Sequence, residues 1–172
     1  MSLKKIVSDF RARYIDKRRL PAAARQNLRC YRVGLPAHDA GLLMVAEARI
    51  EWLKRSQDMP AYRDGGSARD FSLLRGWASS YPETSGYIVP TLIDFAARSN
   101  DQPLADRAQR MLDWLVSIHF PGGGFQGGKV DAPERVPVTF DTGHILLGLA
   151  AEVHAFWRGI SAADGACRHL VA

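Results

Sequence analysis

Two carboxylic acids stand at matching places in the sequence and could handle protons together. Glu83 and Asp141 lie 58 positions apart, each is followed by Thr, and each precedes an apolar stretch of helical period. Glycoside hydrolysis needs one protonated and one ionised carboxyl group flanking the scissile bond. A structural interpretation competes, because a carboxylate at a helix N-terminus is favoured by the dipole and satisfies free N–H groups. Repeated residues usually share a structural reason, so both interpretations stay open.

A third residue that could move protons, His144, lies in the first turn of a helix expected over residues 143–157. The dipole at a helix N-terminus disfavours imidazolium, so a neutral His144 could act as a general base near pH 7. The competing interpretation is a hydrogen-bonded histidine with a structural role. Residue types and positions therefore nominate Glu83, Asp141 and His144 as candidate catalytic residues.

Aromatic side chains stand beside these acids in glycine-rich segments. Trp77, Tyr81, Tyr87 and Phe125 could stack their faces on sugar rings, and loops commonly carry binding residues. Each could equally plug the end of a helical hairpin. Arg75 could neutralise a uronic acid or a phosphate, or it could brace a loop.

These candidates lie between helices that repeat along the chain. Residues 105–112 match residues 163–170 at five of eight positions, and an upstream copy over 46–53 shares the pattern. The pattern, Ala-x3-(Ile/Leu)-x-Trp-Leu, puts the Ala, the aliphatic residue and the Leu on one helical face. Glycine-rich breaks follow at 64–66 and 121–128, where positive φ ends a helix. The sequence thus predicts an all-α fold of stacked helix–loop–helix units.

The repeat also predicts what is buried and what is left open. Trp114 needs an apolar wall, so it is predicted to be mostly buried, and a further helix is expected over residues 86–98. The third unit stops at 170–172, where the pattern requires its Trp-Leu pair. The chain therefore looks cut off in mid-repeat, and self-association through the unfinished edge is expected.

A family resemblance accompanies this repeat and covers residues 40–172. The chain resembles the α/α-toroid proteins, which include six-hairpin glycosidases, sugar 2-epimerases, and squalene-cyclase and prenyltransferase-like proteins. It is most similar to uncharacterised bacterial toroid proteins that accompany polysaccharide biosynthesis. The resemblance is carried by Trp52-Leu53, Asp64-Gly65-Gly66, Arg75-Gly76-Trp77, Ser80-Tyr81-Pro82-Glu83-Thr84, Trp114-Leu115, Gly123-Gly124-Phe125-Gln126-Gly127-Gly128 and Phe140-Asp141-Thr142-Gly143. It implies inner helices around a funnel within an outer ring, a partial toroid of about two and a half hairpins where roughly six close the ring.

The resemblance implies site residues at the funnel mouth, where inner helices begin. Carried over position by position, it gives Arg75, Trp77, Tyr81, Glu83, Tyr87, Gln126, Asp141 and His144. The implied function is a hydrolase, lyase or epimerase that acts on a poly- or oligosaccharide. A non-catalytic helical-repeat binding module and an isoprenoid-handling toroid are the alternatives, although the Asp-x-Asp-Asp motif of terpene cyclases is absent from the sequence.

Composition places these units in a globular protein with a basic arm. The 172 residues are 47% hydrophobic and 24% charged, which is typical of a folded domain. Residues 1–33 carry ten Lys/Arg and two Asp, while the remainder carries thirteen basic and sixteen acidic residues. We divide the chain into a basic N-terminal helix with its connection (1–37) and the incomplete toroid (38–172). A solvated helix with Ile6, Phe10 and Tyr14 as its buried stripe is favoured over a nucleic-acid-binding arm.

The sequence also indicates what the protein does not use. No window approaches the length of a membrane-spanning helix, and no secretory signal is visible. Cys30 and Cys167 have neither disulfide-framework nor zinc-site spacing, so a reducing cytoplasm is expected. The glycine run over 122–128 lacks the Lys-Ser/Thr of a P-loop. We therefore expect no cofactor, no metal and no nucleic acid, with a carbohydrate as the ligand.

Overall fold

The computed structural model describes residues 4, 7, 16–34, 38–60, 62–156 and 160–171, and this part of the chain is mostly helical. The predicted all-α class is confirmed, with one short two-stranded sheet in addition. Residues 6, 10 and 14 lie outside the described residues, so the predicted stripe of the basic arm is not tested. The elements are α2 (Asp16–Arg19), α3 (Ala22–Val33), α4 (Leu42–Asp58), β1 (Phe71–Ser72), β2 (Gly76–Trp77), α5 (Pro82–Ser99), α6 (Gln102–Ile118), α7 (Thr139–Phe156) and α8 (Ile160–Val171).

The expected order of helix, loop and helix is present, although α5 and α7 both begin earlier than predicted. The helix expected over 86–98 spans Pro82–Ser99, because Pro82 has the fixed φ that suits a first helical turn. The helix expected over 143–157 spans Thr139–Phe156. Between α5 and α6, Asn100 adopts a left-handed φ of 53° and Asp101 accepts a hydrogen bond from the Leu104 N–H. This short turn makes α6 antiparallel to α5.

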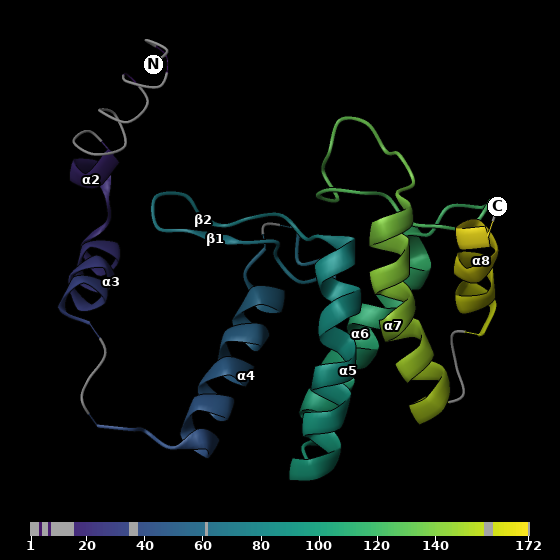
Figure 1. Cartoon of the computed structure of the whole chain (residues 1–172), viewed down its shortest axis with the longest axis horizontal. Helices are drawn as coiled ribbons and strands as arrows, with labels where there is room; N and C mark the ends of the chain where they lie inside the picture. The colour runs from purple at the N-terminus through teal and green to yellow at the C-terminus, as the bar shows by residue number, and fades with distance from the viewer. Residues whose placement is uncertain are drawn as a thin grey trace.

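The sheet is a hairpin that the repeat pattern did not predict. Phe71 pairs with Trp77 and Ser72 pairs with Gly76 in antiparallel register. Gly76 has a φ of 80°, which suits glycine at the end of the turn. In Figure 1 the hairpin extends from the start of α5 over α4, away from α7.

Helices α5 and α7 run side by side and form the centre of the fold (Figure 1). They approach closely because glycine faces the neighbouring helix on both sides of the contact. A Cβ on Gly86 would lie 2.5 Å from the Ile145 Cα, and one on Gly148 would lie 2.5 Å from the Gly86 carbonyl oxygen. Helix α6 packs mainly on α5, and α8 packs on α7.

The hydrophobic core is centred on α6, which is buried against α5 and α7 along one stripe. Trp114, at the end of this stripe, is only 7% exposed, as predicted. Its ring lies against Gly66, where a Cβ would come within 2.4 Å of the indole. The fully buried residues of this helix are Leu104, Ala108, Met111, Leu112 and Leu115. By contrast, Trp52 of α4, at the matching place in the repeat, is 44% exposed.

The two long loops end on the same kind of anchor. The Ser67 N–H donates to Ser85 Oγ over 2.8 Å, and the Phe125 N–H donates to Thr142 Oγ1 over 3.0 Å. In each case a hydroxyl in the first turn of a helix, α5 or α7, accepts from the loop that leads into that helix. The repeat is therefore a repeat of local geometry as well as of sequence.

These anchors correct the register that the acid-Thr motifs suggest. Ser67 and Phe125 are 58 residues apart, but Ser85 and Thr142 are 57 apart, so the second loop is one residue shorter. Asp141 is therefore equivalent to Thr84, and the equivalent of Glu83 is Phe140. The alignment of Glu83 with Asp141 was wrong, because a spacing read from sequence takes no account of the loop's different length.

Candidate functional site

Five of the candidate residues come together where α5 and α7 begin. Glu83 Oε1 lies 3.2 Å from His144 Nδ1, with the Glu83 side chain 23% exposed and the His144 side chain 30% exposed. The two groups are close but are not aligned for a hydrogen bond, and His144 Nδ1 has no hydrogen-bond partner. Both helices direct the positive end of their dipoles to this point, which favours the two carboxylates.

Tyr81 and Asp141 form a second pair next to the first. Burial raises the pKa of the Tyr81 hydroxyl, and the negative charge of Asp141 and a hydrogen bond to that carboxylate raise it further. Asp141 is 6% exposed, and its Oδ1 atom has no hydrogen-bond partner. An unsatisfied buried carboxylate oxygen is costly, and a ligand hydroxyl that donated to it would remove that cost.

Two aromatic rings flank the histidine and face solvent. The Phe140 ring meets His144 edge to face at 4.4 Å, and the Tyr87 ring does so at 5.7 Å. Phe140 is 68% exposed and Tyr87 is 61% exposed, so both keep apolar surface available to a ligand. Sequence reasoning nominated Tyr87 but missed Phe140. The available signal was that Phe140 directly precedes Asp141. Aligning Glu83 with Asp141, and not with Phe140, concealed that signal.

Phe125 and Gln126 were wrong as ligand-binding residues, because the structure buries both. Phe125 is fully buried in the core and donates its N–H to Thr142. Gln126 is 1% exposed, donates to the Lys129 carbonyl and accepts from Arg135 Nε. These two residues fix the second loop beneath the site.

Arg75 and Trp77 lie on the hairpin instead of with the acids. Arg75 is exposed at the turn between β1 and β2. The Trp77 ring lies 4.7 Å from that of Trp52 and 5.1 Å from that of Phe71, in a half-exposed aromatic cluster over α4. The structure thus divides the nominated residues among three places: the starts of α5 and α7, which we call the mouth, the buried second loop with Phe125 and Gln126, and this hairpin.

Nothing in the described part of the chain gathers three or more His, Cys, Asp or Glu side chains in a way that would hold a metal ion. The described helices include none with the length and apolar character needed to cross a membrane. No family model, no curated protein and no solved structure matches this chain.

Proposed function

We propose that the chain forms part of the ring of a carbohydrate-active α/α-toroid, of hydrolase, lyase or epimerase type, acting on a poly- or oligosaccharide. One observation carries this proposal. Glu83, His144, Tyr81 and Asp141 converge at the starts of two neighbouring helices, between the exposed rings of Tyr87 and Phe140. Proton donors and acceptors beside flat apolar surfaces suit a ligand that is rich in hydroxyl groups and has apolar ring faces.

The helix arrangement supports the toroid part of the proposal. Parallel α5 and α7 are the inner helices, and α6 and α8 are the outer helices packed on them. Both inner helices begin at the same end, so the loops before them meet there and form a mouth. A mouth built by several loops is where a helical array can collect side chains from distant parts of the sequence.

Each residue of the mouth has a chemical role in this proposal. His144 accepts a proton through Nε2, with the Glu83 carboxylate 3.2 Å from its other ring nitrogen. Tyr81 and Asp141 bind a sugar hydroxyl through the free Asp141 Oδ1 and exchange a proton with it. Tyr87 and Phe140 position the ring by contact with its apolar face.

The proposal is tested first by binding. Saturation-transfer NMR against neutral and uronate oligosaccharides should show transfer to at least one sugar. Tyr87→Ala and Phe140→Ala should each weaken that binding about tenfold, or ~1.4 kcal/mol. Val116→Ala, an exposed residue of α6 far along the chain from the mouth, is the control and should bind normally. Absence of transfer to every sugar would contradict the proposal.

Turnover of the sugar that binds provides the second test. Glu83→Gln and Asp141→Asn should abolish it while the melting temperature stays within a few degrees, since both replacements keep size and polarity. Product formation is followed by NMR of the anomeric protons. If either variant unfolds, the carboxylate has a structural role at the helix start. If both fold and retain turnover, the catalytic roles are wrong.

We also propose a cytoplasmic location, supported by the cysteines. Cys30 and Cys167 are both free and exposed, and exposed unpaired thiols are typical of reducing compartments. Both should react with a maleimide added during cell lysis. Recovery of the chain with these thiols already oxidised would contradict this location.

A further inference from the structure

The internal repeat identifies a groove that has the shape to receive a helix. Helix α6, its long loop and α7 repeat the order of α4, its long loop and α5. On the α6–α7 pair, one side is covered by α5, which packs on both helices. The corresponding side of the α4–α5 pair is an open groove of about 640 Å³. We call it the α4–α5 groove. It is lined by Val45, Ala46, Ala48, Arg49, Ile50, Trp52, Leu53, Thr91 and Phe95.

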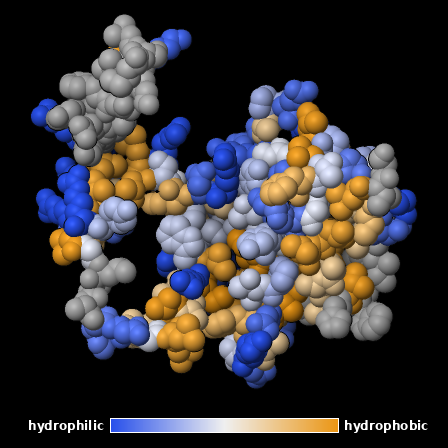
Figure 2. All heavy atoms as spheres, in the orientation of Figure 1, coloured by the Kyte–Doolittle hydropathy of each residue, from blue (hydrophilic) through white to orange (hydrophobic). Residues whose placement is uncertain are grey.

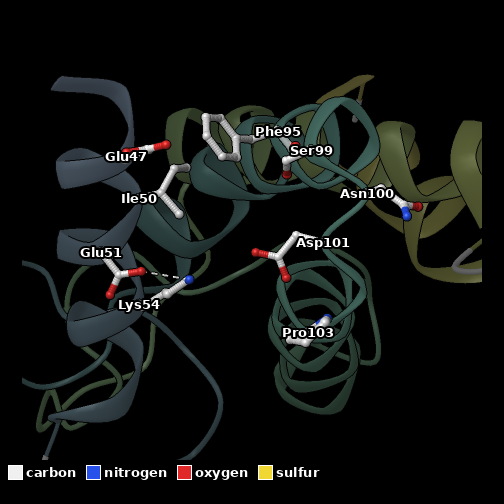
Figure 3. A pocket seen from close by; sticks show the side chains of 9 residues that line it. All are labelled: Glu47, Ile50, Glu51, Lys54, Phe95, Ser99, Asn100, Asp101 and Pro103. Carbon is white, nitrogen blue, oxygen red and sulfur yellow. Dashed lines mark hydrogen bonds and ion pairs between the residues drawn. The ribbon is translucent and has the colours of Figure 1, made fainter. Parts of the chain in front are cut away.

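The groove differs from the hollow on the other flank of α4. That second hollow is shown in Figure 3, where Glu47, Glu51 and Asp101 project around Lys54. Lys54 Nζ is held by Glu51 Oε1 at 2.8 Å. Its polar lining suits water or ions, whereas the α4–α5 groove has only Arg49 and Thr91 among apolar side chains. Figure 2 shows hydrophobic surface at the exposed start of α4, where Leu42, Leu43 and Met44 lie.

The opposite edge of the molecule carries the complementary surface on α7. By the 57-residue register, Gly143 is equivalent to Gly86, the residue through which α5 contacts α7. A Cβ on Gly143 would meet nothing within 4 Å, so this face of α7 is open. Leu147 is 52% exposed and Ala150 is exposed along the same helix. Apolar residues predominate in the α7 sequence, so an exposed apolar face on it lacks a neighbour.

We propose that α7 of one copy of this chain packs into the α4–α5 groove of a second copy, head to tail. The contact would continue the α5–α7 interface with the same helix faces. Gly143 takes the part of Gly86, and Thr91 of the second copy takes the part of Gly148. Since Thr91 is larger than Gly148, the two helices meet at a greater separation than α5 and α7 do.

The chain's own α3 is a poorer occupant of the groove. Its sequence, AAARQNLRCYRV, places Arg25, Arg29 and Arg32 on a helix of twelve residues, together with Gln26 and Asn27. Burying that many polar side chains in an apolar groove costs free energy unless each finds a partner. Helix α7 has an apolar face of the kind already packed inside this fold, so it is the better fit.

The test uses two substitutions that damage opposite edges. Sedimentation velocity of the full chain under reducing conditions should give a mass that rises above 19.0 kDa with concentration. Leu147→Arg damages the α7 edge and Thr91→Arg damages the groove, so each variant alone should stay a monomer. An equimolar mixture should form a species of twice the monomer mass, because each variant retains the edge that the other lacks. Val116→Arg, on the outer surface of α6, is the control and should associate like the unmodified chain.

Circular dichroism checks that each variant folds, and Leu147→Gln or Thr91→Glu replaces an arginine variant that does not. A monomer at every concentration overturns the proposal, including the case in which α3 covers the groove. Association of both single variants at the unmodified level also overturns it, because another surface would then hold the copies together. Failure of the mixture to pair overturns the head-to-tail arrangement.

Discussion

At the scale of residues, the two carboxylates of the mouth have different surroundings. Asp141 is buried and hydrogen-bonded to Tyr81, whereas Glu83 is partly exposed beside His144. Acid and base roles are separated when two titratable groups lie in unlike environments. The two surroundings differ because the acids occupy different positions in equivalent helical turns. Glu83 lies two residues before the Ser85 anchor, whereas Asp141 lies one residue before the Thr142 anchor.

Because of Tyr81, the free energy of unfolding should depend on pH in the alkaline range. Its pKa is raised above 10.0, so the folded state holds the hydroxyl proton more tightly than the unfolded chain does. The resulting stabilisation is complete below pH 10 and is lost as pH rises through the raised pKa. Tyr81→Phe should cost about 1–3 kcal/mol at pH 8, because it removes the donor to buried Asp141.

Urea unfolding at pH 8 and in alkaline buffer measures both effects. The unmodified chain should lose more unfolding free energy than Tyr81→Phe as the pH rises. Two curves that run parallel would show that Tyr81 has no part in the alkaline transition.

The sequence could nominate the residue types of the mouth but not all their orientations. Glu83, Tyr81, Tyr87, Asp141 and His144 do meet, because two helix starts bring them together. Phe125 and Gln126 were assigned to ligand binding because the glycines on both sides indicate a loop. Such a pattern does not show which side chains of the loop are buried in the core. Burial of these two was decided by Thr142, which binds the Phe125 N–H and fixes the loop against the core.

At the scale of elements, close packing of α5 on α7 depends on the absence of a side chain at two positions. Adding a Cβ at Gly86 would force backbone apart, since the nearest atom is the Ile145 Cα. Gly86→Ala should therefore cost about 1–3 kcal/mol, as overpacking does. Gly143→Ala is a matched control in an open position and should be neutral or stabilise by about 0.5–1 kcal/mol. Chemical denaturation of dilute samples measures both, and equal effects would contradict this account.

Trp114 and Trp52 provide a second matched comparison between repeats. Trp114→Ala should cost about 3–5 kcal/mol, because it empties a buried site against Gly66. Trp52→Ala should cost much less, because that ring is 44% exposed and contacts mainly Phe71 and Trp77. Thermal unfolding ranks the two variants. A near-neutral Trp114→Ala would mean that this helix face is wrongly assigned.

The helical class was predictable here because the apolar period and the glycine breaks act locally, although α5 and α7 each begin four residues before the predicted start. The β1–β2 hairpin was not, since two-residue strands have too short a pattern to be recognised. Nor could the sequence distinguish buried Trp114 from exposed Trp52, which occupy the same place in the repeat. The difference depends on whether another helix packs in front of the helical pair, as α5 does for α6 and α7. That packing is a property of the assembled fold.

At the scale of the whole molecule, α4 is joined to the other helices at few points. Open hollows lie on two of its flanks, and it is joined to α6 largely through its last turn. There Arg107 makes two hydrogen bonds to Asp58, of 2.7 and 2.8 Å, and the Gln57 amide donates to the Arg107 carbonyl. Arg107 lowers the pKa of Asp58, as expected of a close ion pair.

Arg107→Ala should loosen α4 without loosening the α5–α7 core. We expect amide exchange in α4 to accelerate about tenfold, which corresponds to ~1.4 kcal/mol of lost local stability. Arg98→Ala breaks the exposed Arg98–Asp94 pair on α5 and should change exchange very little. Hydrogen-exchange mass spectrometry resolves the two regions. Uniform acceleration across the chain would show that α4 and the core open as one unit.

The hydroxyl anchors at Ser85 and Thr142 separate what must be kept from what is free to vary. Each anchor ties its loop to the helix behind it in the same way, although the second loop is one residue shorter. A phenyl ring, Phe140, therefore stands where the first unit has the Glu83 carboxylate, with the anchors preserved. Such a scaffold permits new chemistry by small changes in loop length, which are among the easiest changes for a gene to acquire.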